Sequence, residues 1–279
     1  MIEIGKYNKL EVARIVSFGL YLTDGEEDVL LPEKYAPKIA KVGDMVDVFV
    51  YTDSEDRIIA TTETPFAMVG EIAKLRVVDV NRVGAFMDWG LPKDLFVPFK
   101  QQRERMEVGE DYVVKLLFDE RSNRVMATNK FSNQLIAQCA SDFKIGDKVE
   151  IQPLYKINAG YIVSIDKIFS GMLYNSDIFC DIALGEKMVG YITKLREDKK
   201  VDVALRKAGL EGAEDLKPII VEKLKEAKNN FIALNTKSSP EDIKKYFKMS
   251  KKVFKKVVGM LYKEKIIEVN EKGIKLITK

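Results

Sequence analysis

The C-terminal part of the chain carries lysines whose spacing suits contact with phosphate groups. In a helix that advances about 100° per residue, one arc of roughly 140° would hold Gly259 with the lysines Lys251, Lys252, Lys255, Lys256 and Lys263. The opposite side would be apolar, with Val253, Phe254, Val257, Val258, Met260 and Leu261. This division predicts a helix that packs on one side and offers cations to nucleic-acid phosphates on the other. The alternative is the solvated lysine face of an ordinary surface helix.

A second chemical feature is an aromatic residue beside a glycine, which occurs three times. The three segments read Phe18-Gly19-Leu20-Tyr21, Val83-Gly84-Ala85-Phe86 and Ala159-Gly160-Tyr161-Ile162. Aromatic rings on a strand can stack on nucleic-acid bases, at about 1 to 3 kcal/mol per base. Without further context, a core role for Phe86 and Tyr161 is the alternative.

The composition excludes several kinds of catalysis. The 279 residues include no histidine, which removes histidine-dependent nucleophiles, general bases and metal ligands. Only Cys139 and Cys180 are cysteines, too few for a disulfide scaffold or a four-cysteine zinc site. The acidic runs at 24–28 and 53–56 fall in expected turns and lack calcium-loop spacing. We therefore expect a protein that is not an enzyme and that needs no cofactor or metal.

The elements that position these residues form an internal repeat. Glycine followed by an acid recurs at Gly43-Asp44, Gly109-Glu110 and Gly185-Glu186, each after a Gly-aromatic segment and before an alternating strand. Each copy has about five short strands, which predicts a small Greek-key barrel of the OB type. The connections at 33–41 and 100–108 are expected to supply a short helix before the fourth strand.

The last quarter of the chain is different in charge and in pattern. Residues 214–279 hold 17 lysines against nine acidic residues. Helices are expected at about 218–228, 240–247 and 251–264, with a hairpin from strands 266–269 and 274–277. This order is typical of a winged helix-turn-helix. The fold class is therefore multidomain, mainly β and then α+β, with expected boundaries at 1–66, 67–138, 139–212 and 213–279.

The second copy resembles an S1 RNA-binding domain through Gly84-Ala85-Phe86, Leu95-Phe96-Val97-Pro98 and Gly109. The order of three such copies and a basic C-terminal module resembles the conserved virulence factor B family of bacterial regulators. The resemblance implies RNA binding through aromatic residues on strands two and three, here Tyr21, Phe86, and Tyr161 or Ile162. The histidine that the S1 family places on strand three is replaced by Leu31, Val97 and Tyr174 in the three copies.

Charge distinguishes the copies as binding surfaces. Residues 10–66 hold five basic and 12 acidic residues, which would repel a polyanion and instead favour a protein-facing role for copy one. We expect a composite groove formed by copy three and the winged helix, with copy two assisting through Phe86, Arg121 and Arg124. In copy three the expected contacts are Tyr161, Tyr174, Lys194, Arg196, Lys199, Lys200 and Arg206. Trp89 is expected to be a packing anchor rather than a stacking residue.

These observations predict a non-enzymatic protein that binds single-stranded RNA. The family resemblance implies a post-transcriptional effect on gene expression and a role in virulence regulation. The alternatives are a winged-helix DNA-binding transcription regulator and a ribosome-associated translation factor, with a protein partner on acidic copy one. The N-terminal residues lack the apolar segment of a signal peptide, and no long apolar run occurs, so a cytoplasmic location without membrane association is expected.

Overall fold

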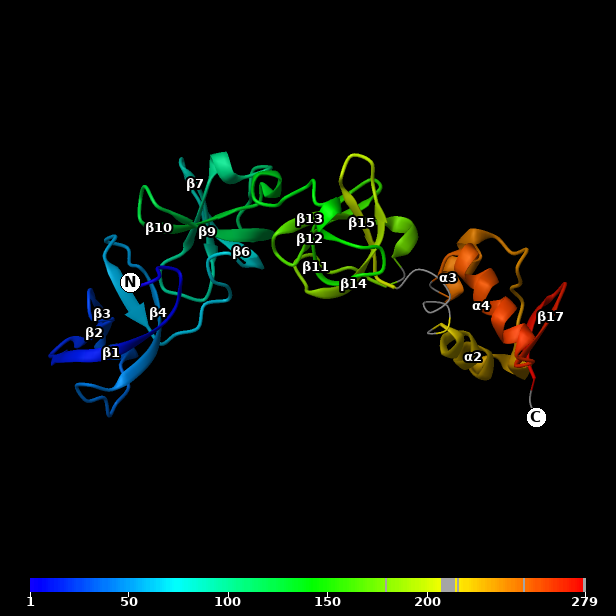
Figure 1. Ribbon diagram of the computed structural model, residues 1–279, viewed down its shortest axis with the longest axis horizontal. Coiled ribbons are helices and arrows are strands. Elements are labelled where there is room, and N and C mark those ends of the chain that lie inside the picture. The colour runs from blue at the N-terminus through cyan, green and yellow to red at the C-terminus, as the bar shows by residue number, and fades with distance from the viewer. Residues whose placement is uncertain (179, 207–213, 215, 248, 278–279) are drawn as a thin grey trace. The chain divides into compact units, whose positions relative to one another are not determined.

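The chain forms two compact units, residues 1–134 and 135–279, in a computed structural model that describes residues 1–178, 180–206, 214, 216–247 and 249–277 (Figure 1). The first unit contains two barrels, and the second contains a third barrel and a small helical domain. The boundaries expected at 66/67 and 138/139 stay predictions, and the one at 212/213 lies outside the described residues.

Each barrel is a closed sheet of five strands with the same strand order, which confirms the expected fold class. Barrel 1 consists of β1 (Lys6–Val16), β2 (Gly19–Thr23), β3 (Asp28–Pro32), β4 (Met45–Thr52) and β5 (Ile58–Thr61). Barrel 2 consists of β6 (Ile72–Val80), β7 (Gly84–Asp88), β8 (Leu95–Pro98), β9 (Asp111–Asp119) and β10 (Arg124–Thr128). Barrel 3 consists of β11 (Lys148–Ile157), β12 (Gly160–Ile165), β13 (Phe169–Tyr174), β14 (Met188–Leu195) and β15 (Val201–Ala204).

The repeated glycine before the acid serves a bulge in the first strand of each barrel. The strand pairing shifts register after Val12, after Val77 and after Pro153. At each shift a free backbone carbonyl accepts a hydrogen bond from a glycine N–H: Gly43 to Val12 at 2.9 Å, Gly109 to Val77 at 2.8 Å, and Gly185 to Pro153 at 2.7 Å. All three glycines have φ between +82° and +91°, a conformation that a side chain disfavours. The repeated glycine in the sequence therefore corresponds to the same bulge and hydrogen bond in all three barrels.

The glycine before each aromatic residue is needed for a close approach between strands. A Cβ at Gly19, Gly84 or Gly160 would lie 2.0 to 2.4 Å from a carbonyl oxygen of the neighbouring strand. No real Cβ tolerates such a contact, so these positions admit only glycine while the backbone keeps this path. The aromatic residue that follows is thereby held at the edge of a tightly wound strand pair.

The short helix expected in each of the two connections is present, but it is a single 3₁₀ turn, Glu33–Tyr35 in the first and Phe99–Gln101 in the second. In the first, Pro37 cannot continue a helix because it has no N–H to donate. In the second, the buried Gln102 side chain donates to the Val97 carbonyl at 2.8 Å and accepts from the Met106 N–H at 3.3 Å. These side-chain bonds hold the loop in an irregular path.

Barrels 1 and 2 share one apolar core through Trp89, as expected for a packing anchor. The Trp89 side chain is 2% exposed, and its ring centroid lies 5.8 Å from that of Phe49 and 6.2 Å from that of Tyr51, both in β4 of barrel 1. Its indole N–H donates to the Lys93 carbonyl at 2.6 Å. The indole is therefore not available for stacking on a base.

The helical domain has the winged-helix order expected from the sequence. It consists of α2 (Lys217–Glu226), β16 (Phe231–Ile232), α3 (Pro240–Phe247), α4 (Lys251–Lys263), β17 (Ile267–Asn270) and β18 (Gly273–Leu276). Its sheet has the order β16-β18-β17, so the expected hairpin gains a third, two-residue strand. Phe247 of α3 packs on Phe254 of α4 with ring centroids 4.9 Å apart, which fixes the two helices against each other.

The shared core makes a prediction about stability. Trp89→Ala should lower the free energy of unfolding of the N-terminal unit by about 3 to 5 kcal/mol, because it opens a cavity in the packing of both barrels. Urea denaturation followed by far-ultraviolet circular dichroism measures this change. Phe18→Ala is the control, because Phe18 is 55% exposed and its loss should cost under about 0.5 kcal/mol. Equal effects of the two substitutions would contradict the shared core.

Candidate nucleic-acid interface

The lysines predicted on the last long helix lie on α4, opposite its buried side. Phe254, Val257, Val258 and Leu261 are buried in the domain core. Of the predicted lysines, four are exposed and form no salt bridge among the described residues: Lys252, Lys255, Lys256 and Lys263. Lys251 is partly buried, and its ammonium group donates to the Lys237 carbonyl at 3.3 Å. Uncompensated exposed ammonium groups are the feature that releases counterions when phosphate binds.

The sequence analysis missed one residue on this face, Tyr262. Tyr262 is 58% exposed, and at about 100° per residue it lies between Lys251 and Lys255 around the helix. Gly259 has open space where a Cβ would be, so the centre of the lysine face has low relief. The same helical arithmetic that found the lysines could have found Tyr262.

In barrel 3 the structure brings Tyr174 of β13 and Arg196 together. The Arg196 guanidinium donates to the Tyr174 hydroxyl at 2.8 Å and, through Nε, to the Asp202 carboxylate at 2.6 Å. Asp202 is 7% exposed, and its hydrogen bond raises the pKa of Arg196 above the usual arginine value. The arginine is therefore a fixed cation beside an aromatic ring, with part of its surface open to solvent.

The expected correspondence of Tyr174 with Leu31 and Val97 was wrong by one position. Tyr174 lies opposite Gly160, as Pro32 lies opposite Gly19 in barrel 1, whereas the buried Leu173 takes the place of Leu31. Successive side chains of a strand point to opposite faces. This register places Tyr174 on the outer face of the barrel, away from the core that contains Leu173.

Tyr161 has a different environment from Tyr174. It pairs in register with Leu173 and packs against the core of barrel 3, with one part of the ring exposed. The Lys156 ammonium lies 5.8 Å from its ring centroid. The structure therefore does not bring Tyr161 and Tyr174 onto one platform, and Ile162 takes the strand position that Phe86 has in barrel 2.

Three of the other predicted cations of barrel 3 lie in or near the turn of the β14–β15 hairpin. Lys194 is exposed on β14, and Lys199 and Lys200 lie in the exposed turn, where Lys200 pairs with Asp198 at 3.1 Å. Arg206 follows β15 and is partly buried. The three lysines thus lie on the same hairpin as Arg196, whereas Arg206 lies beyond the other end of β15.

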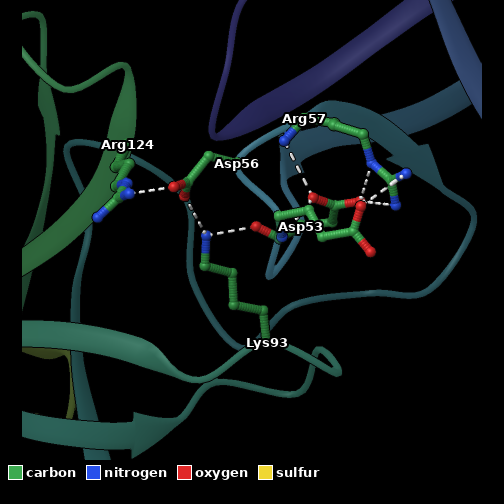
Figure 2. A network of polar contacts seen from close by, with 6 residues as sticks. Asp53, Asp56, Arg57, Lys93 and Arg124 are labelled. Carbon is green, nitrogen blue, oxygen red and sulfur yellow. Dashed lines mark hydrogen bonds and ion pairs between the residues drawn. The ribbon is translucent and has the colours of Figure 1, made fainter.

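In barrel 2 the predicted residues are partly engaged by barrel 1. Phe86 is partly exposed and faces Phe96, with ring centroids 5.2 Å apart and planes 34° apart. The Arg124 guanidinium pairs with Asp56 from the β4–β5 turn of barrel 1, and Figure 2 shows Lys93 reaching the same carboxylate at 3.3 Å. Arg121 is exposed in the β9–β10 turn. A phosphate that approached Arg124 would compete with Asp56.

No helix among the described residues is long and apolar enough to cross a membrane. The described residues also contain no group of three or more acidic, cysteine or histidine side chains placed to hold a metal ion.

Comparisons with known proteins agree with this architecture. Residues 4–63 match the S1 domain, and residues 219–276 match the CvfB-like winged helix domain. The S1 match falls on barrel 1, whereas the sequence resemblance was carried mainly by barrel 2. The chain thus combines S1-type barrels with a winged helix, two types of nucleic-acid-binding domain.

Individual relatives extend over most of the chain. Conserved virulence factor B of Staphylococcus saprophyticus is 26% identical over 86% of this chain and 82% of its own length, and that of Staphylococcus aureus strain USA300 is 24% identical over 86% and 81%. The Bacillus subtilis protein YitL, described as uncharacterised, is 27% identical over 93% and 89%. These matches confirm the resemblance to the conserved virulence factor B family.

A crystal structure of a multidomain protein with nucleic acid binding domains from Streptococcus pneumoniae TIGR4 is also similar. It is 23% identical, covers 98% of both chains and has a TM-score of 0.42.

The ion pairs of Asp56 predict a pH dependence of stability. Hydrogen bonding from Arg124 is the main cause that lowers the pKa of Asp56 below its usual value. A carboxyl with a lowered folded-state pKa stabilises the protein above its unfolded pKa, about 4, and this contribution is lost as the pH falls through the folded value. The urea midpoints of wild type and Asp56→Asn should therefore differ most near pH 7 and converge below pH 4. Asp47→Asn removes an exposed carboxylate of the same barrel that forms no salt bridge among the described residues, and it should show no such trend. A difference for Asp56→Asn that stays constant with pH would contradict the assignment.

Proposed function

We propose that this protein is a single-stranded RNA-binding regulator that acts after transcription, with barrel 3 and the winged helix as its binding surfaces. The observation that carries the proposal is the row of exposed, unpaired lysines on α4, together with Tyr174 beside Arg196 on barrel 3. Lysines would neutralise phosphates, and exposed rings would stack on bases. The RNA path would also include Tyr161 and the cations Lys194, Lys199, Lys200 and Arg206.

The side chains on α4 favour general over sequence-specific binding. Duplex readers use arginine, asparagine or glutamine to form paired hydrogen bonds with base edges. The exposed face of α4 offers lysines and Tyr262 instead. This composition supports RNA binding by charge and stacking over the alternative of a sequence-specific DNA-binding transcription factor. A ribosome-associated factor is the remaining alternative, and co-sedimentation with ribosomes separates it from the others.

A non-enzymatic role fits the site. A chain without histidine cannot use a histidine base, and binding by phosphate neutralisation and stacking needs no cofactor. The relatives called conserved virulence factor B support a regulatory role. We place this activity in the cytoplasm, where messenger RNA is available. The contribution expected from Phe86, Arg121 and Arg124 of barrel 2 stays a prediction, because RNA there must displace Asp56.

Fluorescence anisotropy of the full chain tests the proposal directly. The probes are labelled single-stranded RNA homopolymers, single-stranded DNA and a duplex, each at two salt concentrations. A truncated chain ending at Gly212, a position outside the described residues, is measured beside it. Single-strand RNA preference that disappears in the truncated chain supports the proposal. Duplex preference, or binding unchanged by truncation, contradicts it.

Removing the lysines of α4 should weaken binding to all RNA sequences equally. The variant changes Lys251, Lys252, Lys255 and Lys256 to Ala. Because each phosphate contact on a single strand contributes about 0.7 to the slope of log affinity against log salt, the slope should fall by roughly 2 to 3. Anisotropy titrations at four salt concentrations measure it.

A matched control changes four exposed lysines of barrel 1, Lys9, Lys34, Lys38 and Lys41, to Ala. It removes the same charge from a surface outside the proposed path. If both variants change the slope equally, the effect is one of net charge, and α4 is not the phosphate-binding surface.

Removing the rings of barrel 3 should reduce affinity without unfolding the chain. Tyr174→Leu and Tyr161→Leu should each weaken binding by about 1 to 3 kcal/mol if the ring stacks on a base. Circular dichroism checks the fold, and anisotropy at constant salt measures affinity. Phe18→Leu is the control, because this exposed ring lies on barrel 1. Unchanged affinity for a tyrosine variant would mean that this ring has only a packing role.

A further inference from the structure

A cavity of about 670 Å³ lies between barrel 1 and barrel 2, and the proposed function leaves it without a ligand. Its size is within the roughly 300 to 1,000 Å³ that is typical of binding pockets. The β4–β5 turn of barrel 1 contributes Ser54 and Asp56 to its wall, and barrel 2 contributes Phe86, Phe96 and residues of the β9–β10 turn. The cavity thus lies over the outer aromatic face of barrel 2, formed by Phe86 and Phe96.

The cations that line this cavity leave two of its carboxylates without a salt bridge. Lys93 and Arg124 both pair with Asp56. Asp94 and Asp119 also line the cavity, and neither forms a salt bridge among the described residues. Asp119 accepts hydrogen bonds from the Ser122 hydroxyl and the Arg121 backbone N–H. Such a lining disfavours a phosphate and favours a cationic ligand.

On the equivalent outer face of barrel 1, an arginine lies between an aromatic ring and a carboxylate. The Arg14 guanidinium lies 4.0 Å above the Tyr21 ring and 3.4 Å from the Asp28 carboxylate. Arg14 is the first paired residue after the bulge in β1, and it lies opposite Tyr21. An aromatic ring, a guanidinium and a carboxylate therefore form a set whose three members all come from barrel 1.

Barrel 2 keeps two members of this set and lacks the third. Phe86 takes the position of Tyr21. Asp94 takes the position of Asp28, because Asp94 immediately precedes Leu95, the partner of Met87, just as Asp28 immediately precedes Val29, the partner of Leu22. At the position of Arg14, opposite Phe86, barrel 2 has Asp79. The guanidinium is thus replaced by a second carboxylate.

The electrostatics of Asp94 agree with a missing cation. Burial is the main cause that raises the pKa of Asp94 above its usual value, and the nearby Asp88 and Asp79 raise it further. In barrel 3 the chain again supplies its own cation, because Arg196 joins Tyr174 to Asp202. In barrel 2, by contrast, no arginine among the described residues lies between Phe86 and Asp94.

We propose that this cavity binds an arginine side chain from a basic segment of a partner protein. The guanidinium would stack on Phe86 and Phe96 and form an ion pair with Asp94, as Arg14 stacks on Tyr21 and pairs with Asp28. The strongly acidic barrel 1 would attract the rest of the basic segment. This inference goes beyond RNA binding by barrel 3 and α4, and it gives Phe86 a protein ligand instead of a base.

Two fluorescent peptides of equal charge test the proposal on the full chain: one with four Gly-Arg repeats and one with four Gly-Lys repeats. The arginine peptide should bind more tightly by roughly two- to thirtyfold, the range implied by cation–π energies at exposed to desolvated sites. Because Trp89 lines the cavity and is the single tryptophan of the chain, its emission should change with the arginine peptide. Equal affinities for the two peptides would overturn the proposal.

The sharpest variant is Asp79→Arg, which gives barrel 2 the internal arginine that barrel 1 already has. It should abolish the preference for the arginine peptide while the fold stays intact by circular dichroism. Asp94→Asn should reduce the preference severalfold. The control combines Asp47→Asn with Glu11→Gln, two exposed carboxylates of barrel 1 outside the cavity, and should keep the preference.

The outcomes also separate this proposal from RNA binding. Changing the lysines of α4 should weaken RNA binding and leave the arginine preference unchanged. An Asp79→Arg variant that keeps the preference overturns the arginine site while the RNA proposal stands. Single-stranded RNA or guanosine that displaces the arginine peptide and loses affinity in Phe96→Leu would overturn it in favour of a nucleobase ligand.

Discussion

The bulge in the first strand lets a short sheet of five strands curl until its edges meet, because an extra residue bends the strand and increases its twist. It also determines which side chain emerges beside the outer aromatic residue. The first paired residues after the shift are Arg14, Asp79 and Tyr155, and in barrels 1 and 2 this residue lies directly opposite Tyr21 and Phe86. The backbone feature that closes the barrel thus also sets the chemistry of its outer face.

Three copies of one fold therefore present three different surfaces. Barrel 1 fills its aromatic face with its own arginine, barrel 2 leaves carboxylates beside two phenylalanine rings, and barrel 3 holds Arg196 between Tyr174 and a buried Asp202. The hydrogen bond from the repeated glycine N–H to the bulge carbonyl is the same in all three. The chemistry of each outer surface thus follows from single side chains and not from the barrel fold itself.

The sequence was informative where local chemistry repeats. Glycines at fixed spacing, alternating strands and the Ser250 cap, which accepts a hydrogen bond from the Val253 N–H, predicted the barrels and the winged helix. It was uninformative where contacts join distant segments. Nothing near Arg124 indicates that Asp56, 68 residues away, holds its guanidinium. The register of Tyr174 depends on how many residues separate β12 from β13, which the local sequence does not indicate. The strand β16 has only two residues, too few to show an alternating pattern.

Because Trp89 shares a core with Phe49 and Tyr51, the first two barrels form one structural unit that must be inherited together. A chain divided between β5 and β6 would leave these rings in water on both fragments, with a strong tendency to aggregate. A recombination event that moved barrel 2 alone into another protein would have to replace several apolar residues at once. The pair is therefore the smallest part of the N-terminal unit that evolution can duplicate or exchange without redesigning a surface.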